Sequence, residues 1–265
     1  LAGDALTTGN NNTAVGYNAL GSEDAGDRNV AVGSNALSSM NIGGGDHYNT
    51  AVGYNAGTNI TTGPRNTILG GNAADALTTG QRNTAIGTFA LSADTSGNYS
   101  TAIGYNTLAN QNFTSSTGVY NTAIGYSAGE AMTTGTTNTI LGGLAGNAIT
   151  TGDGNVVIGY DAADVLLDGV HNTLVGEQVA GSLTSGDENI YIGRRAASSA
   201  TTGNNNVAIG TGVTLSSATV SNEVNISNNS VIARFQGAAA AWSFVSDARD
   251  KKDIEDLELG VEFIN

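Results

Sequence analysis

The chain has 265 residues, of which 38 are Gly, one is Pro and none is Cys, and its formal net charge is −14. Aromatic residues make up 6% and charged residues 12%, which suits short strands and tight turns rather than a large globular core. This composition excludes disulfides and thiolate metal sites. It also disfavours nucleic acid as a partner, and the sequence has no apolar run of about 18 residues for membrane insertion.

A five-residue phrase, Asn-Thr-Ala-Val-Gly or a close variant, recurs twelve times, and nine of the eleven intervals between copies are 17 residues. The other two intervals are 20 and 21 residues. A repeat this short cannot bury its apolar side alone and must stack on its neighbours. The spacing therefore predicts an all-β fold, a parallel β-roll or β-solenoid with 17-residue coils over residues 1–227. Residues 223–227 form a decayed thirteenth copy. The closing glycines are Gly16, Gly33, Gly53, Gly70, Gly87, Gly104, Gly125, Gly142, Gly159, Gly176, Gly193 and Gly210.

The phrase predicts a strand whose alternate residues face opposite ways. Thr13 and Val15 share one face, and Asn12, Ala14 and Gly16 share the other. We expect the β-branched face to form the interior of the coil. The small residues of the other face would let another backbone approach, which suggests a homotrimer packed through that face.

The rest of each repeat predicts a second short strand, centred on Ala19 and its counterparts, where a thin coil needs a small residue. Triplets such as Thr61-Thr62-Gly63 predict turns in which Gly adopts a positive φ. The leading Asn is present in eleven of twelve copies, with Ser100 as the exception. Its recurrence predicts a ladder of side-chain amides along the stack.

The longer phrase Asn-Thr-Ala-Ile-Gly-Tyr-Asn-Ala resembles the repeats of trimeric autotransporter adhesin heads and repeats in phage tail fibres. The resemblance implies a left-handed parallel β-roll assembled as a homotrimer. Because the adhesin repeat is usually shorter than this one, it also implies a longer loop in each coil here. Leu1 already lies inside a repeat, so we expect the protein to continue upstream.

The repeat pattern stops after Ser230, and residues 228–245 are predicted to be a linker. Ser246 and Lys251 then lie five residues apart, and a Lys with a lowered pKa could activate the Ser for acyl transfer. From the spacing alone, a charged first turn before an amphipathic stretch at Ile254 and Leu257 explains these residues better.

The whole string from Ser246, Ser-Asp-x-Arg-x-Lys-Lys-x-Ile, resembles the start of the endosialidase-type intramolecular chaperone, a self-cleaving serine–lysine peptidase family at the ends of phage tail spikes and fibres. The resemblance implies Ser246 as nucleophile, Lys251 as its base and Val245–Ser246 as the scissile bond. It further implies that 246–265 begin, with a short α-helical segment, a domain that trimerises the preceding fibre. We expect single-turnover cleavage in the full-length protein only, and no turnover enzyme in the repeats.

The two long repeats carry His47, Tyr48, Phe113 and Tyr120 in loops expected to bulge from the same side of the coil. Insertions on a solenoid often mark its binding face, although neutral variation of a tolerant loop explains them equally. Tyr17 and its counterparts after the repeat glycine suggest a stabilising corner stack, with glycan stacking as the alternative. We expect no cofactor and no metal site.

Together these features predict a structural and adhesive segment of a phage tail fibre, located in the virion. Its expected partners are other copies of itself, a bacterial surface glycan or protein receptor, and other tail proteins. The alternative is the head of a bacterial trimeric adhesin at the cell surface. A minor alternative is an ice-binding protein that uses the Thr-Thr rows.

Overall fold

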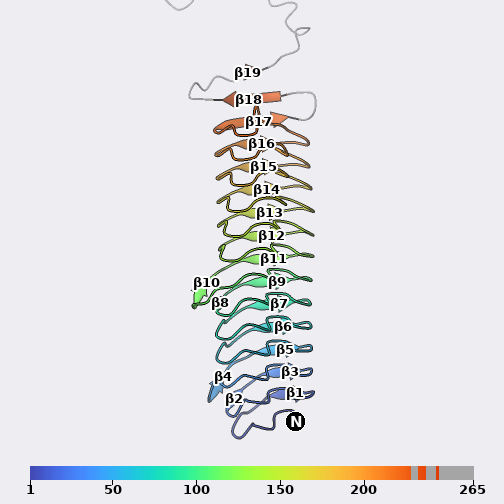
Figure 1. Ribbon diagram of the computed structural model, residues 1–265, viewed down its shortest axis with the longest axis vertical. Coiled ribbons are helices and arrows are strands. Elements are labelled where there is room, and N and C mark those ends of the chain that lie inside the picture. Colours follow the sequence, from blue (N-terminus) through green and yellow to red (C-terminus); the bar gives the residue numbers. More distant parts are fainter. Residues whose placement is uncertain (228–231, 237–242, 245–265) are drawn as a thin grey trace, which may run out of the picture.

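The computed structural model describes residues 1–227, 232–236 and 243–244. These residues wind into a stack of coils, and each coil adds one short strand to a 15-stranded sheet (Figure 1). The predicted all-β solenoid with 17-residue coils is therefore confirmed. The strands of this sheet are β1 (Thr13–Val15), β3 (Val30–Val32), β5 (Thr50–Val52), β6 (Thr67–Leu69), β7 (Thr84–Ile86), β9 (Thr101–Ile103), β11 (Thr122–Ile124), β12 (Thr139–Leu141), β13 (Val156–Ile158), β14 (Thr173–Val175), β15 (Ile190–Ile192), β16 (Val207–Ile209), β17 (Glu223–Ser227), β18 (Ile232–Gln236) and β19 (Ser243–Phe244).

Successive strands from β1 to β17 pair in parallel, and equivalent residues of the repeat face each other. Val207 pairs with Val224, so the decayed copy completes one more coil, as predicted. β18 and β19 then continue the sheet in the antiparallel direction. They lie in the segment predicted to be a linker, while the helix expected within 246–265 lies outside the described residues.

The interior of the coil is lined by the small-residue face of the strand. The middle residue of each three-residue strand from β3 to β16 is buried, with Ala31 and Ile68 both fully inaccessible, whereas Val15 is 55% and Leu69 47% exposed. The prediction that the β-branched face lies inside is wrong. A 17-residue coil is thin, and the space inside the strand is already occupied by Leu20 and Ala19 of the opposite wall and their counterparts.

The predicted second strand is wrong as well, because Ala19 and its counterparts lie in tight turns. Asn18 and Leu20, on either side of it, both have positive φ, at 56° and 51°. Left-handed residues on both sides of Ala19 turn the chain too sharply for a strand. Ala19 itself is fully buried, which confirms that a small residue is needed where the two walls approach.

The glycine of the Thr-Thr-Gly triplets serves stacking rather than a positive φ. Gly80 is outside the left-handed region, which is instead occupied by Arg82, at 57°. A Cβ on Gly80 would lie 2.5 Å from the carbonyl oxygen of Gly97 on the next coil. The triplet therefore keeps adjacent coils close, and the predicted conformation of its glycine is wrong.

The predicted asparagine ladder is confirmed, and it lies inside the coil. The Oδ1 of Asn66 accepts a hydrogen bond from the backbone N–H of Asn83 at 2.9 Å, and its Nδ2 donates to the carbonyl of Gly80 at 2.9 Å. The same pattern recurs from coil to coil. The ladder satisfies backbone groups that the turns leave unpaired, so each coil is tied to the next by buried amides.

Ser100 interrupts this ladder, and Gln111 from the longer insertion restores it. The Gln111 Nε2 donates to the Ser100 hydroxyl at 2.9 Å and to Asp94 at 2.6 Å, and its Oε1 accepts from Asn121 Nδ2 at 2.9 Å. The short Ser side chain leaves room for the amide of Gln111. One insertion thus supplies the polar group that its own coil lacks.

Asn172→Ala should lower the free energy of unfolding by roughly 3 kcal/mol, because it leaves the N–H of Asn189 and the carbonyl of Gly186 buried without partners. Chemical denaturation monitored by circular dichroism measures the loss. Asn110→Ala is the control, since Asn110 is exposed. Equal stability of the two variants would show that the ladder contributes little.

Candidate functional site

The outward face of the main sheet is a flat surface without charge. Strands β1 to β16 of this sheet contain no charged residue, in a chain whose net charge is −14. We call the row formed by the last outward residue of each strand the aliphatic column. None of its side chains is buried, and Leu69, Ile124 and Leu141 are 47%, 36% and 43% exposed. Its members are Val15, Val32, Val52, Leu69, Ile86, Ile103, Ile124, Leu141, Ile158, Val175, Ile192, Ile209 and Ile226.

Beside it runs a second outward row, mostly Thr, formed by the first residue of each three-residue strand, from Thr13 to Val207. The face thus consists of aliphatic and Thr side chains in two parallel rows, and it carries no charge that would repel an apolar partner. Contiguous apolar patches on a surface mark interaction sites more often than scattered apolar residues do. This face is therefore the larger candidate surface for a partner.

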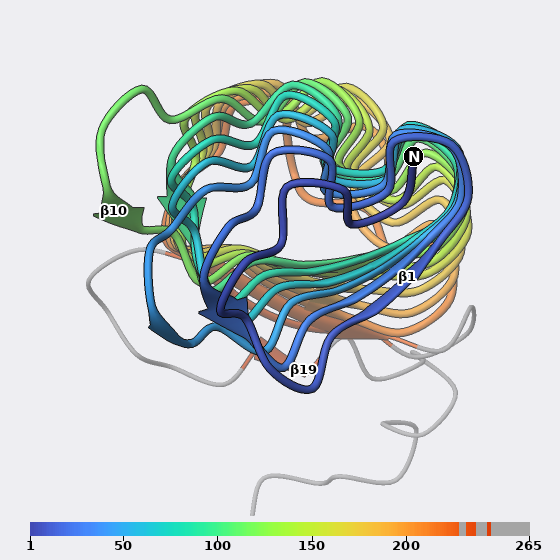
Figure 2. The same cartoon turned by 90° about the horizontal axis from the view of Figure 1, so that it is seen from below.

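The two insertions form small sheets on one side of the stack, as predicted. β4 (Gly45–Asp46) pairs with β2 (Gly26–Asp27) of the preceding coil, and β10 (Thr117–Gly118) pairs with β8 (Gly97–Asn98). In Figure 1 β4 and β10 lie on the same side, and in Figure 2 the β10 insertion extends beyond the outline of the other coils.

The structure separates the four residues predicted to bind a partner. His47 and Phe113 are buried, at 7% and 9% exposure, so their side chains offer little surface to a partner. Tyr48 and Tyr120 are exposed, at 49% and 56%. These two tyrosines occupy equivalent positions, directly before the ladder asparagine, on different coils.

That position holds a row of Arg and Tyr that the sequence analysis missed. We call it the arginine–tyrosine column: Arg28, Tyr48, Arg65, Arg82, Tyr99 and Tyr120, on six successive coils. All six residues are exposed. Tyr99 and Tyr120 stack with ring centroids 4.9 Å apart and planes 4° apart. The Arg82 guanidinium lies 5.3 Å from the Tyr99 ring centroid and donates to its hydroxyl at 2.7 Å.

The tyrosines after the repeat glycine are exposed, and two of them form the expected corner stack. Tyr105 and Tyr126 lie on successive coils with centroids 5.6 Å apart, and Phe89 meets Tyr105 edge-on at 6.2 Å. Tyr17, Tyr54 and Tyr160 are 58–74% exposed and have non-aromatic residues at the same place on adjacent coils.

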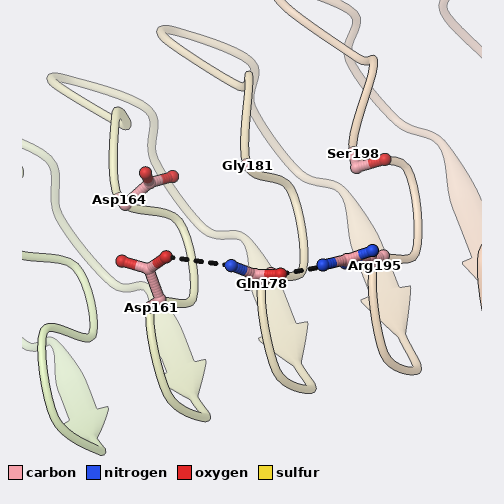
Figure 3. A pocket seen from close by; sticks show the side chains of 6 residues that line it. All are labelled: Asp161, Asp164, Gln178, Gly181, Arg195 and Ser198. Carbon is pink, nitrogen blue, oxygen red and sulfur yellow. Dashed lines mark hydrogen bonds between the residues drawn. The ribbon is translucent and has the colours of Figure 1, made fainter.

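A polar hollow of about 310 Å³ lies among the later coils (Figure 3). Gln178 connects its ends, donating to Asp161 at 3.3 Å and accepting from Arg195 at 2.9 Å. Burial raises the pKa of Asp164, and the nearby charge of Asp161 raises it further. These hydrogen bonds link Asp161, Gln178 and Arg195, whereas the Oδ1 of Asp164 is buried without a hydrogen-bond partner.

Within the described residues no group of three or more His, Cys, Asp or Glu could hold a metal ion. The same part of the chain contains no helix long and apolar enough to cross a membrane. Ser246 and Lys251, predicted as a self-cleaving pair, and the bond Val245–Ser246 lie outside the described residues.

The stacked coils, the parallel in-register sheet and the buried amide ladder define a β-solenoid repeat protein. Comparisons with models of protein families, with curated proteins and with solved structures find no match for this chain.

Proposed function

We propose that this chain is a shaft segment of a phage tail fibre, in which copies of the solenoid associate side by side, as a homotrimer, to form a rod that attaches the virion to its host. The observation that carries the proposal is the uncharged aliphatic face, which runs along the solenoid from Val15 to Ile226. Three copies is the number implied by the resemblance of the repeats to adhesin heads.

A second copy of the same chain is the partner whose repeat matches this surface. The aliphatic side chains recur once per coil, at a strand spacing of about 4.8 Å. A solenoid of the same sequence has the same spacing, so its side chains stay in register with these along the whole length. A globular partner would match only a few coils.

The apolar surface contributes a free energy of the same order as the cost of association. Burying the exposed part of one aliphatic side chain contributes roughly 1 kcal/mol, and the column runs over all the parallel coils. The sum is on the order of 10 kcal/mol per chain. It is comparable with the loss of translational and rotational freedom on association, which costs about 4–15 kcal/mol. The Thr row adds contact area to the same face.

The correction of the strand faces also moves the proposed interface. The Asn/Ala/Gly face is inside the coil, where its small residues admit the next coil of the same chain. The proposed contact between copies is therefore made through the aliphatic column. The insertions with Tyr48 and Tyr120 project from another side of the coil and stay available for a host receptor, a surface glycan or protein, and for other tail proteins.

The proposed self-cleaving chaperone separates a phage tail fibre from a bacterial adhesin head, which would have the same shaft. Full-length wild-type protein should give two bands on a denaturing gel, and Ser246→Ala should give one, because the variant lacks the nucleophile. Lys251→Ala should also give one band. Two bands from the Ser246 variant would end the assignment of the nucleophile and with it the support for a tail fibre.

A further inference from the structure

The arginine–tyrosine column concentrates most of the positive charge of the solenoid in one place. Residues 1–227 contain five Arg and no Lys, and three of these Arg lie in the column. Arg28 forms an ion pair with Asp46 of the first insertion. Within the described residues Arg65 and Arg82 take part in no ion pair. Two exposed guanidinium groups on successive coils are thus left for an external anion.

Neither Arg65 nor Arg82 has an acidic residue directly before or after it in the chain. The residues directly before the column members on these coils are Pro64 and Gln81, and the residues directly after are the buried Asn66 and Asn83. On later coils the same column position holds Thr137, Gly154, His171, the acidic residue Glu188, Asn205 and Asn222, and none of these is Arg or Lys. The positive stretch is therefore confined to the coils between the two insertions.

The backbone at this position disfavours the residues found there. Arg65, Arg82 and Tyr99 have φ values of 63°, 57° and 64°, in the left-handed region, which Asn and Gly adopt most readily. Elsewhere the same column holds residues of both kinds at positive φ: Asn11, Gly154, Asn205 and Asn222, but also Thr137, His171 and Glu188. The positive φ is thus a property of every coil, and the six coils from Arg28 to Tyr120 differ from the others in carrying only Arg or Tyr at this position.

We propose that the arginine–tyrosine column binds an anionic polysaccharide, with Arg65 and Arg82 as the anion contacts. Tyr120 is the platform for the sugar, because the Tyr99 ring is covered by Tyr120 and by the Arg82 guanidinium and therefore holds these two side chains in place. A guanidinium forms paired hydrogen bonds with a carboxylate or sulfate, and an exposed tyrosine face packs against the C–H face of a pyranose while its hydroxyl stays hydrated. The inference rests on the proposed attachment role and names the ligand class for it.

The geometry of the column fits an extended sugar chain. Its members follow one another at a coil spacing of about 4.8 Å, which is close to the advance of one pyranose along a polysaccharide. The insertions at the coils of Tyr48 and Tyr120 bound the site along the rod. Nucleic acid fits less well, because its affinity depends on neutralising many phosphates and the chain as a whole is strongly negative.

The test is a binding titration with four probes of matched length: polygalacturonate, dextran sulfate, neutral dextran and single-stranded DNA. Wild-type protein should bind one or both anionic polysaccharides and not neutral dextran. Arg65→Gln with Arg82→Gln should weaken that binding about tenfold or more. Arg194→Gln with Arg195→Gln is the matched control, because it removes the same charge from exposed arginines elsewhere on the rod, and it should leave binding within about twofold.

Several results would overturn the assignment: no binding to either anionic polysaccharide, equal binding to neutral dextran, tighter binding to DNA, or equal loss in both double variants. Arg65→Lys with Arg82→Lys keeps the charge without the planar fork and should bind with intermediate strength, so it tests the site even if the glutamine pair folds poorly. The native mass, measured on the same samples, reports self-association separately. A trimer that binds no anionic polysaccharide refutes this inference alone, and a monomer that binds refutes the proposed shaft.

Discussion

Gly70→Ala should lower the free energy of unfolding by about 3 kcal/mol or more. Gly70 has a φ of +143°, which an L-residue rarely adopts. A Cβ there would also lie 2.6 Å from both the carbonyl carbon and the oxygen of Gly87 on the next coil. The backbone strain and the steric clash add to each other. Either could be relieved only by moving the two coils apart, and each coil is hydrogen-bonded to the coils on both sides of it.

The neighbouring residue supplies the control for this prediction. A Cβ on Gly71 would meet no atom within 4 Å, and its φ is outside the left-handed region. Gly71→Ala should therefore change stability by no more than about 0.5 kcal/mol. Chemical denaturation of both variants measures the difference. Similar losses in the two would mean that the glycine column does not set the distance between coils.

Charges placed on the aliphatic column should dissociate the proposed assembly without unfolding the solenoid. The test variant combines Leu69→Glu, Ile124→Glu and Leu141→Glu. Each copy would then bring three unpaired carboxylates into an apolar contact, and each buried charge would cost roughly several kcal/mol. The three side chains point outward and are 36–47% exposed, so each coil can still form. Sedimentation velocity should show single chains with an unchanged circular dichroism spectrum.

The matched control places the same three charges on another side of the coil. Thr62→Glu, Thr134→Glu and Thr202→Glu alter exposed residues of the Thr-Thr rows. This variant should keep the mass of the wild type. Dissociation of both variants to the same degree would point to general charge repulsion in an already acidic chain, and would remove the aliphatic column as the interface.

The features that repeat in every coil could be predicted from the sequence. The interval between glycines gave the solenoid, the recurrent Asn gave the amide ladder, and the small residue at Ala19 and its equivalents predicted a tight approach of two walls. Each depends on one chemical requirement that a single residue type meets. Residues 223–227 kept the period with altered residues, and they form the thirteenth parallel strand.

Hydrophobicity could not predict which face of the strand lies inside the coil, because both faces carry apolar residues. Ile and Val contact water at the outward positions of the strand, whereas the middle residue of each strand from β3 to β16 of the main sheet lies inside, whether it is Ala or a larger residue such as Ile68 or Tyr191. Burial preference describes a globular core and does not apply to a coil of 17 residues. The glycine of the Thr-Thr-Gly triplet was misassigned for a related reason, because its role depends on the next coil and not on its own turn.

The candidate site was predicted only in part. Tyr48 and Tyr120 are exposed as expected, whereas His47 and Phe113 are buried. The arginine–tyrosine column was missed because the residue before each ladder asparagine varies, and a consensus discards positions that vary. Aligning the coils and examining each column for charge and aromatic character would have found it.

The native mass of the protein tests the central claim, that the aliphatic column is buried between copies of this chain. Mass spectrometry under native conditions, or sedimentation equilibrium, should give three times the 26.5 kDa of one chain. The mass should stay constant on dilution until it falls directly to that of a single chain. A particle of one chain at every concentration, with the coils folded, would contradict the account.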